Sequence, residues 1–216
     1  MNAITFDGSW MNQFDPSDTR PGDFTRTDGS VVEADMMHGS GFDVPYLIGD
    51  GFEAVWLPYW GGASMAIVLP DSTPAEWLAE TETISLLEMR QSAYDQPFTD
   101  LALPRFEFTS RTMLGKTLID LGMPSAFDSV LADLTGMSEP GGPDRLALAE
   151  VIHQAMVRVD EVGTKAAAAT AVVATTESGE PEPRTLIIDC PFVFFIVDDM
   201  TAAPIFSGIV EDPTVG

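Results

Sequence analysis

Residues 161–183, with the sequence EVGTKAAAATAVVATTESGEPEP, decide the fold of this chain. The segment holds no aromatic residue and is dominated by small side chains, which leaves three interpretations open. Its run of four alanines favours a helix, because alanine is the strongest helix former. Its small residues and its end rich in Pro and Glu are also typical of a flexible linker. The third interpretation is a strand, whose side chains point alternately to the two faces of a sheet.

The alternation of side chains supports the strand. Every second residue from Thr164 to Thr176 is uncharged and either small or β-branched. This set consists of Thr164, Ala166, Ala168, Thr170, Val172, Ala174 and Thr176. The other set carries the charges of Lys165 and Glu177, and the first proline is Pro181. Such a segment can enter a sheet with its uncharged face buried, because it brings neither an unpaired charge nor a missing backbone donor into the core.

Composition excludes several functional classes. The chain has 216 residues, 34 acidic and 10 basic side chains, and a formal net charge of −24. With 45% hydrophobic residues it is too apolar to be disordered, and its length allows one or two domains with a buried core. The charge repels phosphate, so we expect neither nucleic acid nor an anionic membrane surface as a partner. No apolar run approaches the 18 residues of a membrane helix.

The residues that usually carry catalysis or bind metals are scarce. The single cysteine, Cys190, excludes an internal disulfide and a cysteine-based metal site. The two histidines, His38 and His153, lie in no metal-binding motif, and no G-x-S-x-G motif is present. We therefore expect no metal, no cofactor and no enzymatic activity.

Short apolar runs bounded by Gly, Pro, Asp or Ser predict a β-rich chain. The expected strands cover residues 31–37, 52–59, 64–69, 101–108, 192–197 and 205–210. The runs 64–69 and 192–197 are apolar on both faces and predict central strands. Thr73 and Glu76 form a capping box that predicts a helix to about Glu80. Further short helices are expected within 83–93 and within 116–127, the latter stopping near Gly122.

Motifs in a fixed order accompany this pattern along nearly the whole chain. They are NAITFDGSW (2–10) with Phe14, LPYWGGASMAIVLP (57–70), LPRF (103–106), LGMPSAF (121–127) with ADLTGM (132–137), HQAMVRVDEVGTKAAAA (153–169), DCPFVFFIVD (189–198) and FSGIVEDP (206–213). Together they resemble the serpin family of serine protease inhibitors. The resemblance implies an α+β fold of mostly antiparallel sheets with small helices, in which residues 161–183 are the hinge and the exposed reactive-centre loop.

The resemblance also implies a mechanism. Serpins offer the loop as bait, and the protease that cleaves it is held as an acyl-enzyme while the loop inserts into the main sheet as an extra strand. Gly163 would give the hinge its backbone freedom, and the small side chains that follow would enter the sheet without steric conflict. The implied hinge residues are Glu161, Gly163, Thr164, Ala166, Ala167, Ala168 and Ala169. Small residues here predict an inhibitory member of the family.

The position of the reactive bond follows from family spacing. Counting from Glu161 places the bond at Glu177–Ser178. A glutamate before the bond suits a protease with a basic specificity pocket, so a glutamate-cutting serine protease is the expected target. Because residues 174–176 are small, an elastase-like protease that cuts one residue earlier is the alternative target.

Three further residues receive structural roles from the resemblance. His153 falls in the shutter beneath the main sheet, where it would hydrogen-bond residues that include Asn2. Trp10 falls in the breach, where the loop first inserts. These interpretations favour a structural over a catalytic role for His153.

The resemblance implies an incomplete serpin domain over residues 1–216. A serpin domain has on the order of 350 residues or more, and this chain matches roughly its C-terminal 60%. Self-association through an exposed sheet is therefore expected. The alternative function is a truncated or non-inhibitory serpin-like protein that traps no protease on its own. Family habit implies a secreted protein, although residues 1–8 do not resemble a signal peptide.

Overall fold

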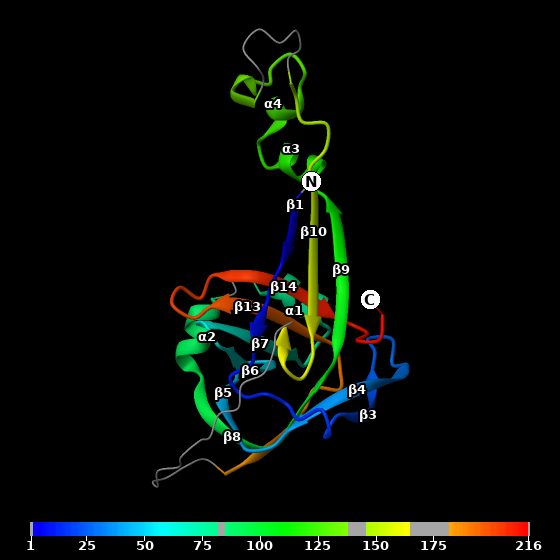
Figure 1. The fold of residues 1–216 in the computed structure, drawn as a ribbon, viewed down its shortest axis with the longest axis vertical. Helices are drawn as coiled ribbons and strands as arrows, with labels where there is room; N and C mark the ends of the chain where they lie inside the picture. Colours follow the sequence, from blue (N-terminus) through cyan, green and yellow to red (C-terminus); the bar gives the residue numbers. More distant parts are fainter. Residues whose placement is uncertain (1, 82–84, 138–145, 165–181, 216) are drawn as a thin grey trace. The chain divides into compact units, whose positions relative to one another are not determined.

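A computed structural model describes residues 2–81, 85–137, 146–164 and 182–215 (Figure 1). The chain divides into two compact units. The first combines Met1–Thr5 with Phe108–Val157, and the second combines Phe6–Glu107 with Arg158–Gly216. In the described residues, no helix is both long enough and apolar enough to cross a membrane.

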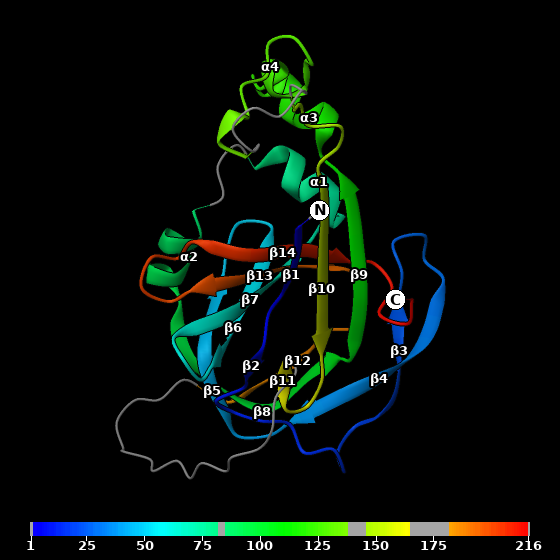
Figure 2. The same cartoon turned by 45° about the horizontal axis from the view of Figure 1, so that its top comes forward.

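The second unit is built on a large, mainly antiparallel sheet (Figure 2). Its strands run in the spatial order β14 (Pro204–Val210), β13 (Phe192–Asp198), β7 (Ala63–Pro70), β6 (Phe52–Tyr59), β5 (Phe42–Ile48), β8 (Tyr94–Pro104), β4 (Val31–Gly39) and β3 (Arg20–Thr25). A short strand, β12 (Arg184–Ile187), pairs in parallel with β8. The expected strands 31–37, 52–59, 64–69, 192–197 and 205–210 are confirmed as β4, β6, β7, β13 and β14.

The core of this unit lies around β7 and β13, which pair with each other. Six successive residues of β13, 192–197, are buried, and so are residues 64–68 of β7. This confirms the prediction, made from runs that are apolar on both faces, that these strands are central. Trp77 and Leu86, from the helices α1 (Pro74–Glu80) and α2 (Leu86–Ser92), pack into the same cluster as Trp56.

The start of α1 agrees with the sequence. The Thr73 side chain accepts a hydrogen bond from the Glu76 N–H, and the Glu76 carboxylate accepts one from the Thr73 N–H. This reciprocal pair satisfies donors that a helix start leaves unbonded. Of the expected helix 83–93, residues 82–84 lie outside the described residues, and α2 covers Leu86–Ser92.

A separate three-stranded sheet contains β1 (Asn2–Thr5), β10 (Ile152–Val159) and β9 (Phe106–Met113), in the order β1–β10–β9 (Figure 1). β1 runs parallel to β10, with Asn2 opposite His153. All four residues of β1 are exposed. Self-association through this sheet stays a prediction, to which an exposed terminal strand lends support.

Short helices follow β9 in the first unit. They are α3 (Gly115–Asp120), α4 (Pro124–Phe127) and a 3-10 helix over Thr135–Met137. The stop expected near Gly122 is confirmed, because Gly122 adopts a φ of +103° between α3 and α4, a conformation that few side chains tolerate.

The prediction of one strand over residues 101–108 is wrong. β8 ends at Pro104 and β9 begins at Phe106, and the two strands belong to different sheets. Arg105 makes the transition, and its backbone N–H donates to the Asp35 carbonyl oxygen at 2.8 Å. An apolar run predicts a strand but carries no information about which sheet its two ends join.

Candidate functional site

The segment predicted to be the hinge leaves β10 through a tight turn. Asp160 and Gly163 exchange two backbone hydrogen bonds, of 3.0 and 3.2 Å, across this turn. The chain then forms β11 (Gly163–Thr164), which pairs antiparallel with β2 (Gly8–Ser9). The remaining hinge residues, Ala166, Ala167, Ala168 and Ala169, and the bond Glu177–Ser178 lie outside the described residues.

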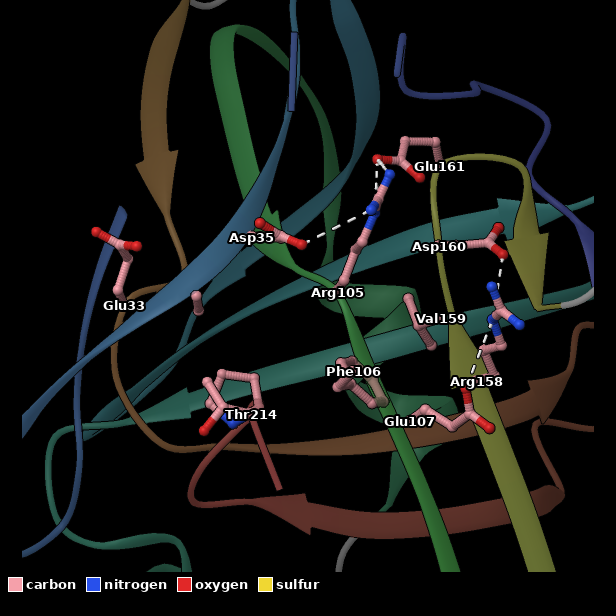
Figure 3. A pocket seen from close by; sticks show the side chains of 12 residues that line it. Glu33, Asp35, Arg105, Phe106, Glu107, Arg158, Val159, Asp160, Glu161 and Thr214 are labelled. Carbon is pink, nitrogen blue, oxygen red and sulfur yellow. Dashed lines mark hydrogen bonds and ion pairs between the residues drawn. The ribbon is translucent and has the colours of Figure 1, made fainter. Parts of the chain in front are cut away.

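Glu161 is held by an ion pair at this turn. Arg105 donates from Nε to the Glu161 carboxylate at 2.8 Å and forms a second contact through Nη2, and the Thr19 hydroxyl donates to the same oxygen. The Glu161 side chain is only 5% exposed, whereas that of Arg105 is 41% exposed. Figure 3 shows the pair, with Asp35 on the other side of Arg105 at 3.7 Å. A nearly buried carboxylate therefore has several charge-assisted partners.

These contacts shift the pKa of both partners. Burial alone pushes the pKa of Glu161 upward, but the hydrogen bonds from Arg105 and Thr19 outweigh burial and leave the pKa below its ordinary value of 4.5. The hydrogen bond to Glu161 raises the pKa of Arg105 despite partial burial. Both side chains are therefore charged at neutral pH.

The ion pair lines a charged cavity of about 470 Å³ (Figure 3). On its β10 side, Arg158 lies 3.7 Å from Glu107 and 3.6 Å from Asp160. In the part of the chain that is described, no three His, Cys, Asp or Glu side chains gather closely enough to hold a metal ion. Ion pairs thus connect the segments that line the cavity.

Trp10 packs against the hinge. Its Nε1 donates to the Asp160 carbonyl oxygen at 2.9 Å, and its backbone N–H donates to the Val162 carbonyl oxygen at 2.9 Å. The ring is 1% exposed and stacks on Tyr59, with centroids 4.2 Å apart and planes 12° from parallel. The residue that the family resemblance assigns to the breach thus contacts the turn before the loop.

Gly163 is required by the space around it. It adopts a φ of +148°, and a Cβ at this position would lie 2.1 Å from the Gly8 carbonyl oxygen. Both constraints come from the close pairing of β11 with β2. The hinge glycine thus allows a close backbone approach as well as an unusual φ.

Sequence reasoning missed three residues of this site. Arg105 and Tyr59 stand in the quoted motifs LPRF and LPYW, but nothing in those motifs indicates their partners, Glu161 and Thr164. Thr19 carried no sequence signal at all.

The proposed shutter pair is adjacent but not hydrogen-bonded. Asn2 and His153 lie opposite each other on β1 and β10, yet in the described residues no hydrogen bond joins their side chains. The shutter role of the two residues stays a prediction. Neighbouring strands are about 4.8 Å apart, and side chains in register reach 3 Å only where both rotamers turn toward each other.

The Glu161–Arg105 pair predicts an acid-sensitive hinge. Because folding lowers the pKa of Glu161, its contribution to stability is complete above the unfolded value of 4.5 and is lost as the pH falls through the lower folded value. The difference in melting temperature between the wild-type chain and Glu161→Gln should therefore shrink with falling pH. Melting curves between about pH 3 and 6 measure it. A difference that stays constant across this range would contradict the prediction.

Comparison with known proteins defines the class. The family model described as serpin (serine protease inhibitor) matches residues 1–213. The chain belongs to the serpin family, and its α+β fold of mainly antiparallel strands with small helices is that of serpins of known structure. The native structure of the thermophilic serpin tengpin matches 97% of this chain and 54% of its own, with a TM-score of 0.79 and 27% identity.

Relatives in sequence come from distant organisms. An uncharacterized serpin-like protein of Thermococcus kodakarensis is 35% identical over 218 residues, which cover 100% of this chain and 50% of that protein. An α1-antitrypsin homolog of Cyprinus carpio is 32% identical over 215 residues, 99% of this chain and 56% of that protein. The chain thus spans about half the length of these relatives.

Proposed function

We propose that this chain carries the hinge and bait loop of a serine protease inhibitor that acts as a suicide substrate. A target protease cleaves the loop at about Glu177–Ser178, and the loop then inserts into the sheet that contains β10. The observation that carries the proposal is the buried position of Thr164 beside β2, called its seat below. Thr164 is 1% exposed and pairs with Gly8. The first residue of the loop already occupies an internal position.

The strand before the loop is anchored in a way that suits this function. Arg105 and Thr19 fix Glu161, which stands five residues before Ala166, the first alanine on the uncharged face. The loop therefore begins from a defined point on the sheet. A free linker would need no buried ion pair and no glycine fitted against a neighbouring backbone.

The target follows from charge. Glu177 before the bond, with Glu180 and Glu182 just after it, favours a protease whose specificity pocket is basic. We propose a glutamate-cutting serine protease outside the cell as the target, with an elastase-like enzyme as the alternative. Relatives are about twice as long as this chain, and we propose that trapping needs the part of the family fold that the chain does not cover.

The proposal is tested by exposing the chain to both proteases. We expect a covalent complex that survives denaturing electrophoresis and a released peptide, identified by mass spectrometry. The peptide should begin at Ser178 with the glutamate-cutting enzyme, or at Glu177 with an elastase-like enzyme. Glu177→Ala should abolish cutting by the glutamate-specific enzyme, whereas Glu180→Ala, a matched loss of one nearby carboxylate, should not.

Two other outcomes are informative. Cleavage at Glu177 without a covalent complex would favour the alternative, a truncated or non-inhibitory serpin-like protein. Cleavage that leaves the Glu177–Ser178 bond intact with both proteases would refute the assigned bait position.

A further inference from the structure

We infer that Tyr59 is a positioning residue whose hydroxyl holds Thr164 in its buried seat on β2 before any protease acts. The inference rests on the proposed function, because it assigns a role to the point from which the loop would insert. Tyr59 ends β6, and Thr164 lies in β11, 105 residues further along the chain.

The contact joins two buried hydroxyl groups. The Tyr59 Oη and the Thr164 Oγ1 lie 2.9 Å apart, and each residue is 1% exposed. Both groups are shielded from solvent, and in the described residues each hydroxyl has the other as its hydrogen-bond partner. Removing one partner would leave the other unsatisfied in the core, which costs more than an average hydrogen bond contributes.

The tyrosine ring is fixed on two sides. Trp10 stacks on it at 4.2 Å, and Phe6 contacts it edge-on with centroids 5.0 Å apart. The Trp60 N–H also donates to the Ser9 carbonyl oxygen at 2.8 Å, which ties the end of β6 to β2. The hydroxyl is therefore aimed at Thr164 by packing that does not involve Thr164 itself.

The tyrosine also keeps its proton. Burial raises the pKa of Tyr59 far above its ordinary value of 10. The phenol thus keeps its O–H group at physiological pH, and the contact with Thr164 does not switch there.

Holding Thr164 inside has a consequence for trapping. A loop whose first residue is already seated starts insertion without first having to find the sheet. If the seat opens more often, insertion competes less well with hydrolysis of the acyl-enzyme, and more inhibitor is cleaved without trapping protease.

The test is a double-mutant cycle read by amide hydrogen exchange. Tyr59→Phe and Thr164→Val each leave one buried hydroxyl unpaired and should increase opening at residues 8–9 and 163–164 by about tenfold. The double variant should open no more than either single variant, because it leaves no orphaned hydroxyl. In contrast to Thr164→Val, the variant Thr164→Ser keeps a hydroxyl at this position, and its exchange should stay at the wild-type level.

Controls separate positioning from general stability. Tyr46→Phe removes a hydroxyl from another tyrosine that is 1% exposed, one that donates to Glu53 at 2.7 Å, and should leave exchange at the hinge unchanged. The amides of β13 should also keep their exchange rates in the Tyr59 and Thr164 variants. The inference would be overturned if the exchange accelerations of the two single variants multiply in the double variant. It would also be overturned if the amides of β13 exchange faster by the same factor.

The exchange experiment needs no protease, so it fails or succeeds separately from the proposed function. If Tyr59 and Thr164 are coupled in the exchange experiment but no protease is trapped, the role of Tyr59 stands and the inhibitor proposal fails. Trapping without coupling would do the reverse. Where both hold, Tyr59→Phe should raise severalfold the number of inhibitor molecules consumed per protease trapped.

Discussion

Gly163→Ala is expected to expel Thr164 from its seat and to separate β11 from β2. The new Cβ would lie 2.1 Å from the Gly8 carbonyl oxygen and 2.7 Å from the Ser9 Cα, so backbone rather than a flexible side chain must move. The φ of +148° adds strain for any residue with a Cβ. We expect a loss of at least about 3 kcal/mol at the hinge, measured as accelerated amide exchange at residues 8–9 and 163–164.

Gly61→Ala is the matched control for this change. Gly61 also has a positive φ, of +105°, but nothing lies within 4 Å of its would-be Cβ. The control variant therefore carries the conformational strain without the clash and should lose about 1 kcal/mol. If Gly163→Ala proves no more destabilising than Gly61→Ala, the close approach of β11 to β2 is not a constraint on the hinge.

Glu161→Lys is expected to have the second-largest effect. The substitution places a cation beside Arg105 in a position where the native carboxylate is 5% exposed, and it leaves Thr19 without its acceptor. Breaking a fully buried pair costs about 3–5 kcal/mol. Because Arg105 is 41% exposed and solvent screens its charge, we expect about 2 kcal/mol here. Chemical denaturation monitored by tryptophan fluorescence measures the loss, since Trp10 contacts the same turn.

Two variants separate the causes of this effect. Glu161→Gln removes the charge but keeps an acceptor for Thr19, and should lose about half as much. Asp35 is the outer partner of Arg105, lies 3.7 Å from it and is 60% exposed. Asp35→Asn should therefore lower the free energy of unfolding by less than about 0.5 kcal/mol. An Asp35→Asn loss equal to that of Glu161→Lys would show that the cluster, rather than Glu161, carries the stability.

The central strands of the fold could be predicted from sequence because each is a continuous apolar run. Residues 64–68 and 192–197 bury both faces, so hydrophobicity alone locates the two strands. The start of α1 could be predicted because a capping box is local, with its two partners three residues apart. The hinge assignment, which rests on the order of glycine, threonine and alanines in the sequence, stays a prediction.

The partners of the hinge could not be predicted, because they are distant in sequence. Thr19 meets Glu161 across 142 residues, and Tyr59 meets Thr164 across 105. Arg105 appeared to lie inside a strand, whereas it stands between two sheets. Pair contacts of this kind depend on topology, which the composition of a single segment does not encode.

The distances along the chain between these partners have a consequence for synthesis. The Trp10 indole bonds to the Asp160 carbonyl oxygen across 150 residues, and β1 pairs with β10 across a similar span. A ribosome adding about 5–20 residues per second needs roughly 8–30 s to cover such a span. During that interval Trp10 and β1 lack the partners that they contact in the folded chain. In contrast, β6 and β7 are neighbours in sequence and can already pair. The contacts of Trp10 with the turn at Asp160 can therefore form only after residue 160 has been synthesised.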